Sequence, residues 1–255
     1  MPLLSVQSLE KSFGGIRVSN NISLDIPVGG RVALIGPNGA GKTTFVNLVC
    51  GFIKPDSGRV LFDGKDVTSL NNAQRIRRGL VRSFQISRLF HDLSFRDHIR
   101  LALLQRDGCS GRMFSRIDSS AVREEEATAI LEKLNLAHLG DQKVRGAAYG
   151  QHRLLEIAIA VAMKSKVLLL DEPAAGVSRS ELPQILNAIE SLPKEMGILM
   201  IEHDLDFAFR FASEVVVLAS GAIIFHGSPE HVVQNAEVRH AYLGSYKAKP
   251  LGGKA

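Results

Sequence analysis

The apolar positions in the second half of the chain repeat with two different periods. Segments 167–170, 198–201 and 215–218 are short, continuous apolar runs, which are typical of strands buried on both faces. Segments 154–163 and 182–189 lie between them and place apolar residues at helical spacing. Short buried strands that alternate with helices predict an α/β fold with a mostly parallel sheet, covered by helices on both faces.

The first half of the chain has a different pattern. Segments 4–9, 23–26 and 59–62 are apolar or alternating and are separated by Gly- and Pro-containing turns, which indicates a β-rich region. Farther along, Ala127, Ile130, Leu131 and Leu134 share one face of a predicted helix. We expect Asp118 or Ser119 to cap that helix.

A phosphate-binding motif follows the apolar run that ends at Ile35. Residues 36–44 fit G-x-x-x-x-G-K-[ST], and a predicted helix begins at Lys42 and ends at Cys50. In this context backbone N–H groups and the positive end of the helix dipole favour a bound polyphosphate. We expect Lys42 to reach the phosphates and the Thr43 hydroxyl to ligate Mg²⁺. The predicted nucleotide contacts are Asn38, Gly39, Ala40, Gly41, Lys42, Thr43 and Thr44.

Two acidic residues follow the predicted strand at 167–170. A carboxylate at Asp171 would hold Mg²⁺ opposite Thr43, and Glu172 would orient or deprotonate a water that attacks the γ-phosphate. Glu202 and His203 follow another predicted strand. Because the carboxyl ends of parallel strands meet at one sheet edge, these groups and the phosphate loop are expected to lie together.

Composition and charge argue against several other classes of protein. The 255 residues are 45% hydrophobic and 22% charged, and the two cysteines, Cys50 and Cys109, follow no metal or redox spacing. The sequence has no run of eighteen apolar residues, so no transmembrane helix is predicted. No signal peptide is predicted either. The net charge of +5 has its densest cluster at five arginines, which we interpret as a solvated surface without nucleic-acid binding: Arg75, Arg77, Arg78, Arg82 and Arg88.

The remaining motifs resemble those of the ATP-binding-cassette (ABC) ATPases. Residues 147–153 (AAYGQHR) are similar to the signature sequence of that family, and Phe84-Gln85 is similar to its Q-loop. Residues 174–178 resemble the D-loop and residues 202–204 the switch-histidine segment. Phe13 stands where the family stacks an aromatic ring on adenine, with Val18 nearby. The ordered set spans residues 3–244.

This resemblance implies a fold and a division of the chain. It implies a P-loop NTPase (RecA-like) core with an N-terminal antiparallel β subdomain and an inserted α-helical subdomain. A single ABC ATPase domain would cover residues 1–244, with the core at 1–86 and 159–244, the helical subdomain at 87–158 and a flexible tail at 245–255.

It also implies a catalytic mechanism shared between two cassettes that sandwich two ATP molecules. Each nucleotide would lie between one chain's phosphate loop and the signature of the other chain, here Ala148, Gly150 and Gln151. Gln85 would sense Mg²⁺ and the attacking water, and His203 would contact the γ-phosphate. The implied catalytic residues are Glu172, His203, Gln85 and Lys42, and the implied metal ligands are Thr43, Gln85 and Asp171, with ATP and Mg²⁺ as cofactors.

Within the family, residues 82–90, 173–176, 227–230 and 241–244 resemble the branched-chain amino-acid uptake ATPases. Lipopolysaccharide-export ATPases are close relatives and remain an alternative; a cassette acting on ribosomes or nucleic acid is a weaker one. The resemblance implies transmembrane permease subunits, an indirect solute-binding protein and a place on the cytoplasmic face of the membrane. Segment 85–100 would receive a permease helix, although Phe90, Leu93 and Phe95 suit docking and a plain core equally well.

One departure from the family pattern concerns the signature. The family has Leu-Ser where this chain has Ala147-Ala148, and alanine has no hydroxyl donor for the γ-phosphate. Ser178 replaces the usual Asp or Asn of the D-loop. Because these losses act on the partner's nucleotide, we hypothesise an asymmetric heterodimer with a paralogous cassette. A slow but symmetric pump remains the alternative.

Overall fold

The computed structural model describes residues 1–83, 89–108, 121–244 and 246. The chain forms two compact units. The first contains Met1–Arg82, Lys166–Glu172 and the chain from Pro193 onward, and the second contains Ser83–Ser165 and Pro173–Leu192. Several predicted features lie outside the described residues: Gln85, Arg88, Cys109, the helix cap at Asp118 or Ser119, and the tail apart from residue 246.

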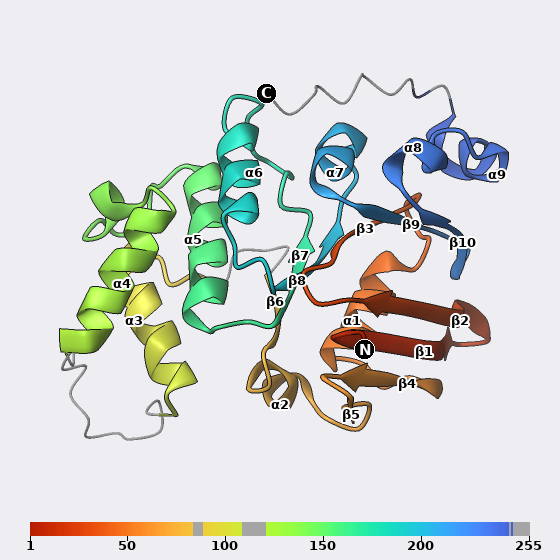
Figure 1. Cartoon of the computed structure of the whole chain (residues 1–255), viewed down its shortest axis with the longest axis horizontal. Coiled ribbons are helices and arrows are strands. Elements are labelled where there is room, and N and C mark those ends of the chain that lie inside the picture. The colour runs from red at the N-terminus through yellow and green to blue at the C-terminus, as the bar shows by residue number, and fades with distance from the viewer. Residues whose placement is uncertain (84–88, 109–120, 245, 247–255) are drawn as a thin grey trace. The chain divides into compact units, whose positions relative to one another are not determined.

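A six-stranded sheet forms the centre of the first unit, in the order β10-β9-β3-β8-β7-β6 (Figure 1). Every neighbouring pair is parallel except β9 and β10. The prediction of a mostly parallel sheet is confirmed. The strands are β3 Arg31–Ile35, β6 Leu80–Arg82, β7 Val167–Asp171, β8 Gly197–Ile201, β9 Glu214–Ala219 and β10 Ala222–Gly227.

A second, antiparallel sheet in the same unit has four strands in the order β2-β1-β4-β5. The expected N-terminal β subdomain is therefore present, and its first strand is longer than the apolar pattern predicted. The β1–β2 ribbon continues to the pair Phe13 and Ile16 because backbone pairing persists where both side chains are exposed. The strands are β1 Leu4–Phe13, β2 Ile16–Ile26, β4 Ser57–Phe62 and β5 Lys65–Asp66.

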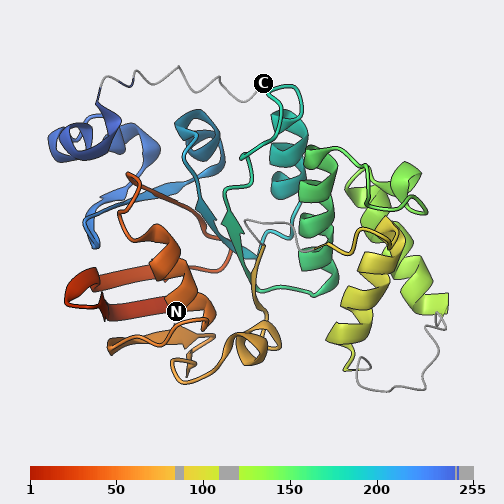
Figure 2. The same cartoon turned by 180° about the vertical axis from the view of Figure 1, so that it is seen from behind.

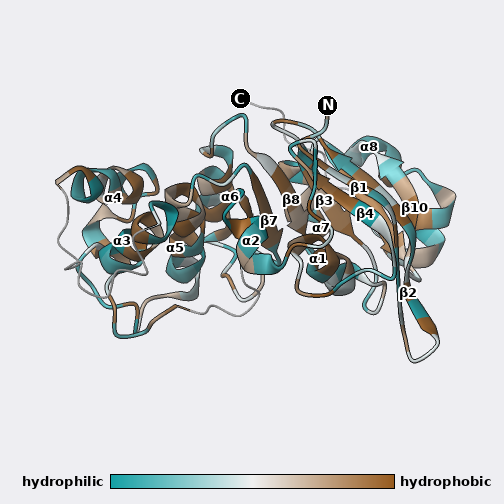
Figure 3. Ribbon diagram, turned by 90° about the horizontal axis from the view of Figure 1, so that it is seen from below, coloured by the Kyte–Doolittle hydropathy of each residue, from teal (hydrophilic) through white to brown (hydrophobic). Residues whose placement is uncertain are grey.

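The alternation of side chains along β3 divides the core of this unit into two clusters. Val32 and Leu34 pack with helix α1 (Lys42–Cys50) and the antiparallel sheet, whereas Ala33 and Ile35 pack with helix α7 (Leu205–Phe211). The central strands are accordingly apolar in Figure 3. The other helices of the unit are α2 Asn72–Ile76, α8 Pro229–Val232, α9 Ala236–Val238 and η2 Arg239–Leu243.

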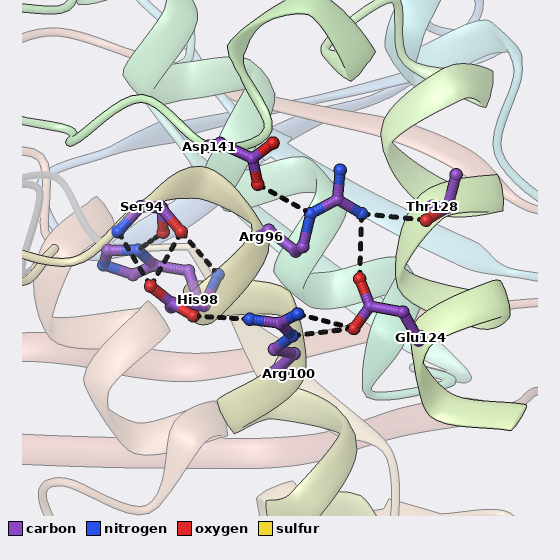
Figure 4. A network of polar contacts seen from close by, with 8 residues as sticks. Ser94, Arg96, His98, Arg100, Glu124, Thr128 and Asp141 are labelled. Atoms are coloured by element: carbon purple, nitrogen blue, oxygen red, sulfur yellow. Dashed lines mark hydrogen bonds and ion pairs between the residues drawn. The ribbon is translucent and has the colours of Figure 1, made fainter. Parts of the chain in front are cut away.

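The second unit is built from helices packed around α5, as Figure 2 shows. Ser94 begins α3 with a capping box, because its hydroxyl accepts the Asp97 N–H and Asp97 accepts the Ser94 N–H. Arg96 on α3 contacts Glu124 and Thr128 on α4 and also Asp141 (Figure 4). The helices are α3 Phe95–Arg106, α4 Ala121–Lys133, η1 Ala137–Leu139, α5 Tyr149–Ala162 and α6 Leu182–Glu190.

Backbone hydrogen bonds connect the segment before α3 to the segment before α5. Val144 N–H donates to Leu93 O at 3.0 Å and Arg145 N–H donates to His91 O at 3.0 Å. Ser94 and Lys143 form an isolated antiparallel bridge next to the contact of Val144 with Leu93. The segment that follows the Q-loop motif is thereby paired with the segment that leads into the signature.

One interpretation of surface residues needs correction. The arginine cluster is not uniformly solvated, because Arg75 is 1% exposed and the Arg82 side chain 11% exposed. Arg77 and Arg78 are exposed as predicted. For Phe90 and Phe95 the sequence left docking and a plain core equally open: Phe90 is exposed, whereas Phe95 is fully buried at the start of α3 and is part of the core. No helix within the described ranges combines the length and the apolar composition that a membrane span requires.

Candidate nucleotide site

The phosphate loop connects β3 to α1 in the first unit. The Lys42 side chain is buried, and its Nζ donates to the carbonyl oxygens of Gly36 at 2.6 Å and Pro37 at 3.0 Å. Helix α1 begins after Gly41, and among the described residues no side chain caps its first turn. The first N–H groups of α1 therefore remain available for an anion.

Two glycines of the loop are required by their surroundings. Gly36 has φ 150°, and a Cβ there would lie 2.0 Å from the Leu218 carbonyl oxygen. Gly41 has φ 103°, and a Cβ there would lie 2.6 Å from the Val18 carbonyl oxygen. The loop consequently lies close to β9 and β2, and any larger residue at either position would displace it.

The end of β7 supplies the two predicted carboxylates. Asp171 is 3% exposed and pairs with the guanidinium of Arg82, which ends the neighbouring strand β6. Glu172 follows with φ 51°, a left-handed conformation that is uncommon for residues with a Cβ. Its N–H donates to the Ile201 carbonyl oxygen at 2.9 Å, so the end of β8 fixes this turn.

Glu172 and His203 contact each other directly. The His203 Nε2 atom lies 3.1 Å from Glu172 Oε1, and both side chains remain partly accessible. The buried Glu202 carboxylate accepts the backbone N–H groups of His203 at 2.9 Å and Asp204 at 3.2 Å. Glu202 thereby holds the loop that presents His203 after β8.

Two influences shift the pKa of Lys42 in opposite directions. Burial lowers the pKa of the Lys42 ammonium, while the carboxylates of Glu172 and Asp171 raise it. These three groups come from the ends of β7 and the start of α1, and β3, β8 and β7 are adjacent in the sheet. The predicted meeting of the strand ends at one sheet edge is therefore seen in the structure.

The two predicted adenine contacts lie on the β1–β2 ribbon. Phe13 is 46% exposed, and Lys11 Nζ lies 5.5 Å from the centre of its ring. Val18 is close to the phosphate loop, because its carbonyl oxygen abuts Gly41 and Gly221. An exposed aromatic ring is available for stacking, and the ring has no apolar core function at this position.

The predicted signature residues belong to the second unit and surround the start of α5. Ala148 occupies the N-cap position and has no side-chain acceptor, but its N–H donates to Gln151 Oε1 at 2.9 Å. A Cβ on the buried Gly150 would lie 2.8 Å from Glu181 Oε1. Ser178 donates to the same Glu181 carboxylate at 2.6 Å. The signature and D-loop motifs are therefore joined through Glu181 within this unit.

Arg82 and Tyr242 also lie at the site and were not among the predicted residues. Tyr242 accepts a hydrogen bond from the Gly36 N–H, and burial, the dominant influence, raises the pKa of its phenol. Arg82 reaches the Asp171 carboxylate across two neighbouring strands. Neither contact has a short-range signal in the sequence, because each depends on which strands and helices are neighbours.

The donor set at this edge suits a small hard cation that is also held by phosphate oxygens. The described ranges contain no group of three or more His, Cys, Asp or Glu able to hold a metal alone. Thr43 and Asp171 offer one hydroxyl and one carboxylate. Mg²⁺ is usually bound by one or two carboxylates together with substrate phosphates, so these residues fit it.

A phosphate loop, a strand-end acid pair and a histidine in contact with that pair, on a mostly parallel sheet, define an α/β nucleotide-binding cassette. The sequence profile described as ABC transporter matches residues 19–175. The chain belongs to the ABC transporter family. The prediction of an ABC ATPase from the sequence motifs is confirmed.

Individual relatives are similar to this chain over nearly its whole length. A probable branched-chain amino acid transport ATP-binding protein, LivG of Archaeoglobus fulgidus, is 36% identical, with 96% of each chain covered. The lipopolysaccharide export system ATP-binding protein LptB of Escherichia coli K12 is 33% identical, covering 96% of this chain and 98% of LptB. A crystal structure of an ABC-transporter cassette in its ADP conformation is 31% identical, with a TM-score of 0.83 and coverage of 96% and 100%.

Proposed function

We propose that this chain is the ATP-hydrolysing subunit of a membrane importer for branched-chain or similar amino acids. The observation that carries the proposal is the contact of Glu172 with His203, beside Lys42 and Asp171, at adjacent strand ends. Support for the cargo class comes from the resemblance to relatives named as branched-chain amino acid transport proteins.

Each residue of the site has a chemical task in this proposal. Lys42 exchanges its two carbonyl contacts for phosphate oxygens, and the first turn of α1 donates N–H groups to the same phosphates. Glu172 accepts a proton from the attacking water or orients it. His203 holds Glu172 in place and contacts the γ-phosphate. Phe13 and Val18 contact the adenine.

Thr43 and Asp171, with Gln85, would hold Mg²⁺. When bound, this ion neutralises charge that develops on the β- and γ-phosphates. The tasks of Thr43 and Asp171 are to supply a hydroxyl and a carboxylate oxygen, and the remaining ligands come from phosphates and water.

The assembly proposed for the chain contains two cassettes. Each nucleotide lies between the phosphate loop of one chain and Ala148, Gly150 and Gln151 of the other. Residues 87–158 act as a helical subdomain that receives a permease helix, and a solute-binding protein delivers the cargo on the far side of the membrane. The chain then resides on the cytoplasmic face of that membrane.

The altered signature suggests that the two nucleotide sites are unequal. Ala148 has no hydroxyl for the γ-phosphate that the partner holds, whereas Lys42, Glu172 and His203 serve this chain's own nucleotide. We propose a heterodimer with a paralogous cassette, in which the site at this chain's phosphate loop is the more active one.

Isolation of the intact complex tests the function. The chain is purified with its associated subunits, these are identified by mass spectrometry, and the complex is reconstituted in vesicles with leucine and ATP. We expect permease subunits, a second cassette and ATP-dependent leucine uptake that is abolished by Glu172→Gln. A complex that hydrolyses ATP without moving any amino acid contradicts the cargo.

Export of a lipid-linked molecule is the second candidate, supported by the similarity to LptB at 33% identity. The same preparation distinguishes the two. Recovery of lipid-binding export subunits in place of amino-acid permeases, with lipid extraction on addition of ATP, favours export.

A further inference from the structure

Arg82 connects the two elements that carry Thr43 and Asp171, two of the proposed metal ligands. Its guanidinium pairs with Asp171 Oδ2 at the end of β7 and donates to Asn47 Oδ1 on α1 at 2.7 Å. The Arg82 side chain is 11% exposed and that of Asp171 4% exposed, so the contact is shielded from water. We propose that Arg82 is a positioning residue, which sets the Asp171 carboxylate relative to the Thr43 hydroxyl.

The place of Asn47 on α1 makes the connection specific. Thr43 and Asn47 are four residues apart in one helix, so they lie one turn apart on the same face. Arg82 therefore binds Asp171 with one nitrogen and, with another, the residue one turn below Thr43. The planar guanidinium holds both partners in a fixed relation, which a flexible ammonium group would not do.

The surroundings of Arg82 restrict its own movement. Its guanidinium carbon lies 5.9 Å from the centre of the Phe52 ring, which covers it from the loop after α1. Its backbone is fixed by the parallel pairing of Arg82 with Leu169. A buried ion pair of this kind contributes little net stability compared with apolar residues, so stability alone does not account for it.

Arg75 gives a contrast within the same unit. This arginine is also buried, but within the part of the chain that the structure describes it donates to backbone carbonyl oxygens alone, those of Leu48, Val49, Thr68 and Leu70. It therefore closes the carboxyl end of α1, and its hydrogen bonds within the described ranges reach neither Thr43 nor Asp171. Arg75 serves as the matched control for a purely structural buried arginine.

The proposal rests on the proposed function, since it requires that Thr43 and Asp171 hold the metal of a metal–nucleotide complex. Binding of nucleotide without metal depends on Lys42 and the loop N–H groups. Loss of Arg82 therefore weakens only the additional affinity that Mg²⁺ confers on ATP. This separation makes the two proposals independently testable.

The experiment titrates the purified full-length chain with a fluorescent ATP analogue, once in EDTA and once in Mg²⁺. For Arg82→Met we expect metal-free affinity within about twofold of wild type, and a loss of about tenfold in the gain due to Mg²⁺. Arg82→Lys and Asn47→Ala should show smaller losses of the same kind. Arg75→Met should lower the Tm and leave the gain due to Mg²⁺ intact.

The outcomes separate the proposals. A folded Arg82→Met protein with the full gain due to Mg²⁺ overturns the role of Arg82. An equal loss in Arg75→Met also overturns it, because general loosening would then explain the effect. Should Arg82→Met not fold, Arg82→Lys and Asn47→Ala decide the same question. If wild type binds no nucleotide in either buffer, the proposed function fails instead.

Discussion

At the scale of single residues, Glu172 is in an uncommon backbone conformation at a predicted catalytic position. Left-handed φ values for residues other than glycine cost on the order of 1–3 kcal/mol and persist only where neighbours enforce them. Here the Ile201 carbonyl and the His203 ring do so. The conformation directs the carboxylate along the sheet edge toward His203.

Replacing Glu172 with Gln should remove hydrolysis and retain nucleotide. The amide keeps the size of the side chain but cannot accept a proton, so we expect ATP turnover of the assembled complex to fall by roughly 10²- to 10⁴-fold. Radiolabelled ATP that co-elutes with the complex measures retention. Glu195→Gln, an equivalent change at an exposed position, should leave turnover unchanged.

His98 makes folding stability depend on pH. The Phe90 N–H donates to its Nε2 at 2.9 Å, so Nδ1 carries the proton and donates to Ser94 O at 2.7 Å. Burial lowers the pKa of His98, and His152 lowers it further, while the Ser94 carbonyl and Asp97 raise it. The folded state therefore favours the neutral ring more than the unfolded state does.

The direction in which stability changes with pH follows from this difference between the folded and unfolded states. As the pH falls below about 6.5, unfolded chains bind the proton first and the contribution of His98 to stability is lost. We expect urea unfolding to show a smaller advantage of wild type over His98→Gln at pH 5.5 than at pH 8. An advantage that grows on acidification would contradict a buried neutral His98.

At the scale of elements, the start of α3 is set by its capping box. Ser94→Ala removes the acceptor for the Asp97 N–H, and we expect a loss of about 1 kcal/mol in unfolding free energy. Chemical denaturation measures it, with Ser12→Ala at an exposed position of β1 as the control. An equal loss of unfolding free energy in Ser94→Ala and Ser12→Ala would show that the capping box does not stabilise α3.

The elements also show what could and could not be predicted from the sequence. Helix α1 has the predicted bounds, because a glycine loop precedes it and Gly51 follows it with φ 75°. Strands β7 and β8 agree with the prediction to within one residue, because buried parallel strands are continuously apolar.

The failures concern charged residues with distant partners. A local charge pattern is the same for a surface cluster and for a buried arginine, so the sequence alone predicts that Arg75 and Arg82 are solvated. Their partners come from α1 and β7, and only the packing of these elements identifies them. The contact between Glu181 and the signature glycine was missed for the same reason.

At the scale of the whole molecule, the altered signature is the main question for the assembled transporter. Ala148→Ser restores a hydroxyl where the family has one, and we expect the ATP-bound pair of cassettes to form roughly tenfold more readily. Cross-linking of the assembled complex with ATP, together with its ATPase rate, measures this. Ala147→Ser, one residue earlier, is the control.

The same substitution has a local effect that must be measured separately. Serine at 148 with Gln151 would complete a capping box on α5, where only half of one exists now. Unfolding of the isolated chain reports that stabilisation. If the cap stabilises the chain while ATP-driven pairing and turnover stay unchanged, the two nucleotide sites do not differ for the reason proposed.

The pairing of residues 91–94 with residues 143–145 affects how such a protein diverges. Peptide groups form these links, so mutation of the side chains on either segment leaves the connection in place. Exposed side chains such as Phe90 can therefore change without loss of these hydrogen bonds. Proline is excluded at positions 144 and 145, because their N–H groups are the donors. A related protein with a different membrane partner can therefore change the exposed side chains of these segments and still keep the backbone hydrogen bonds between them.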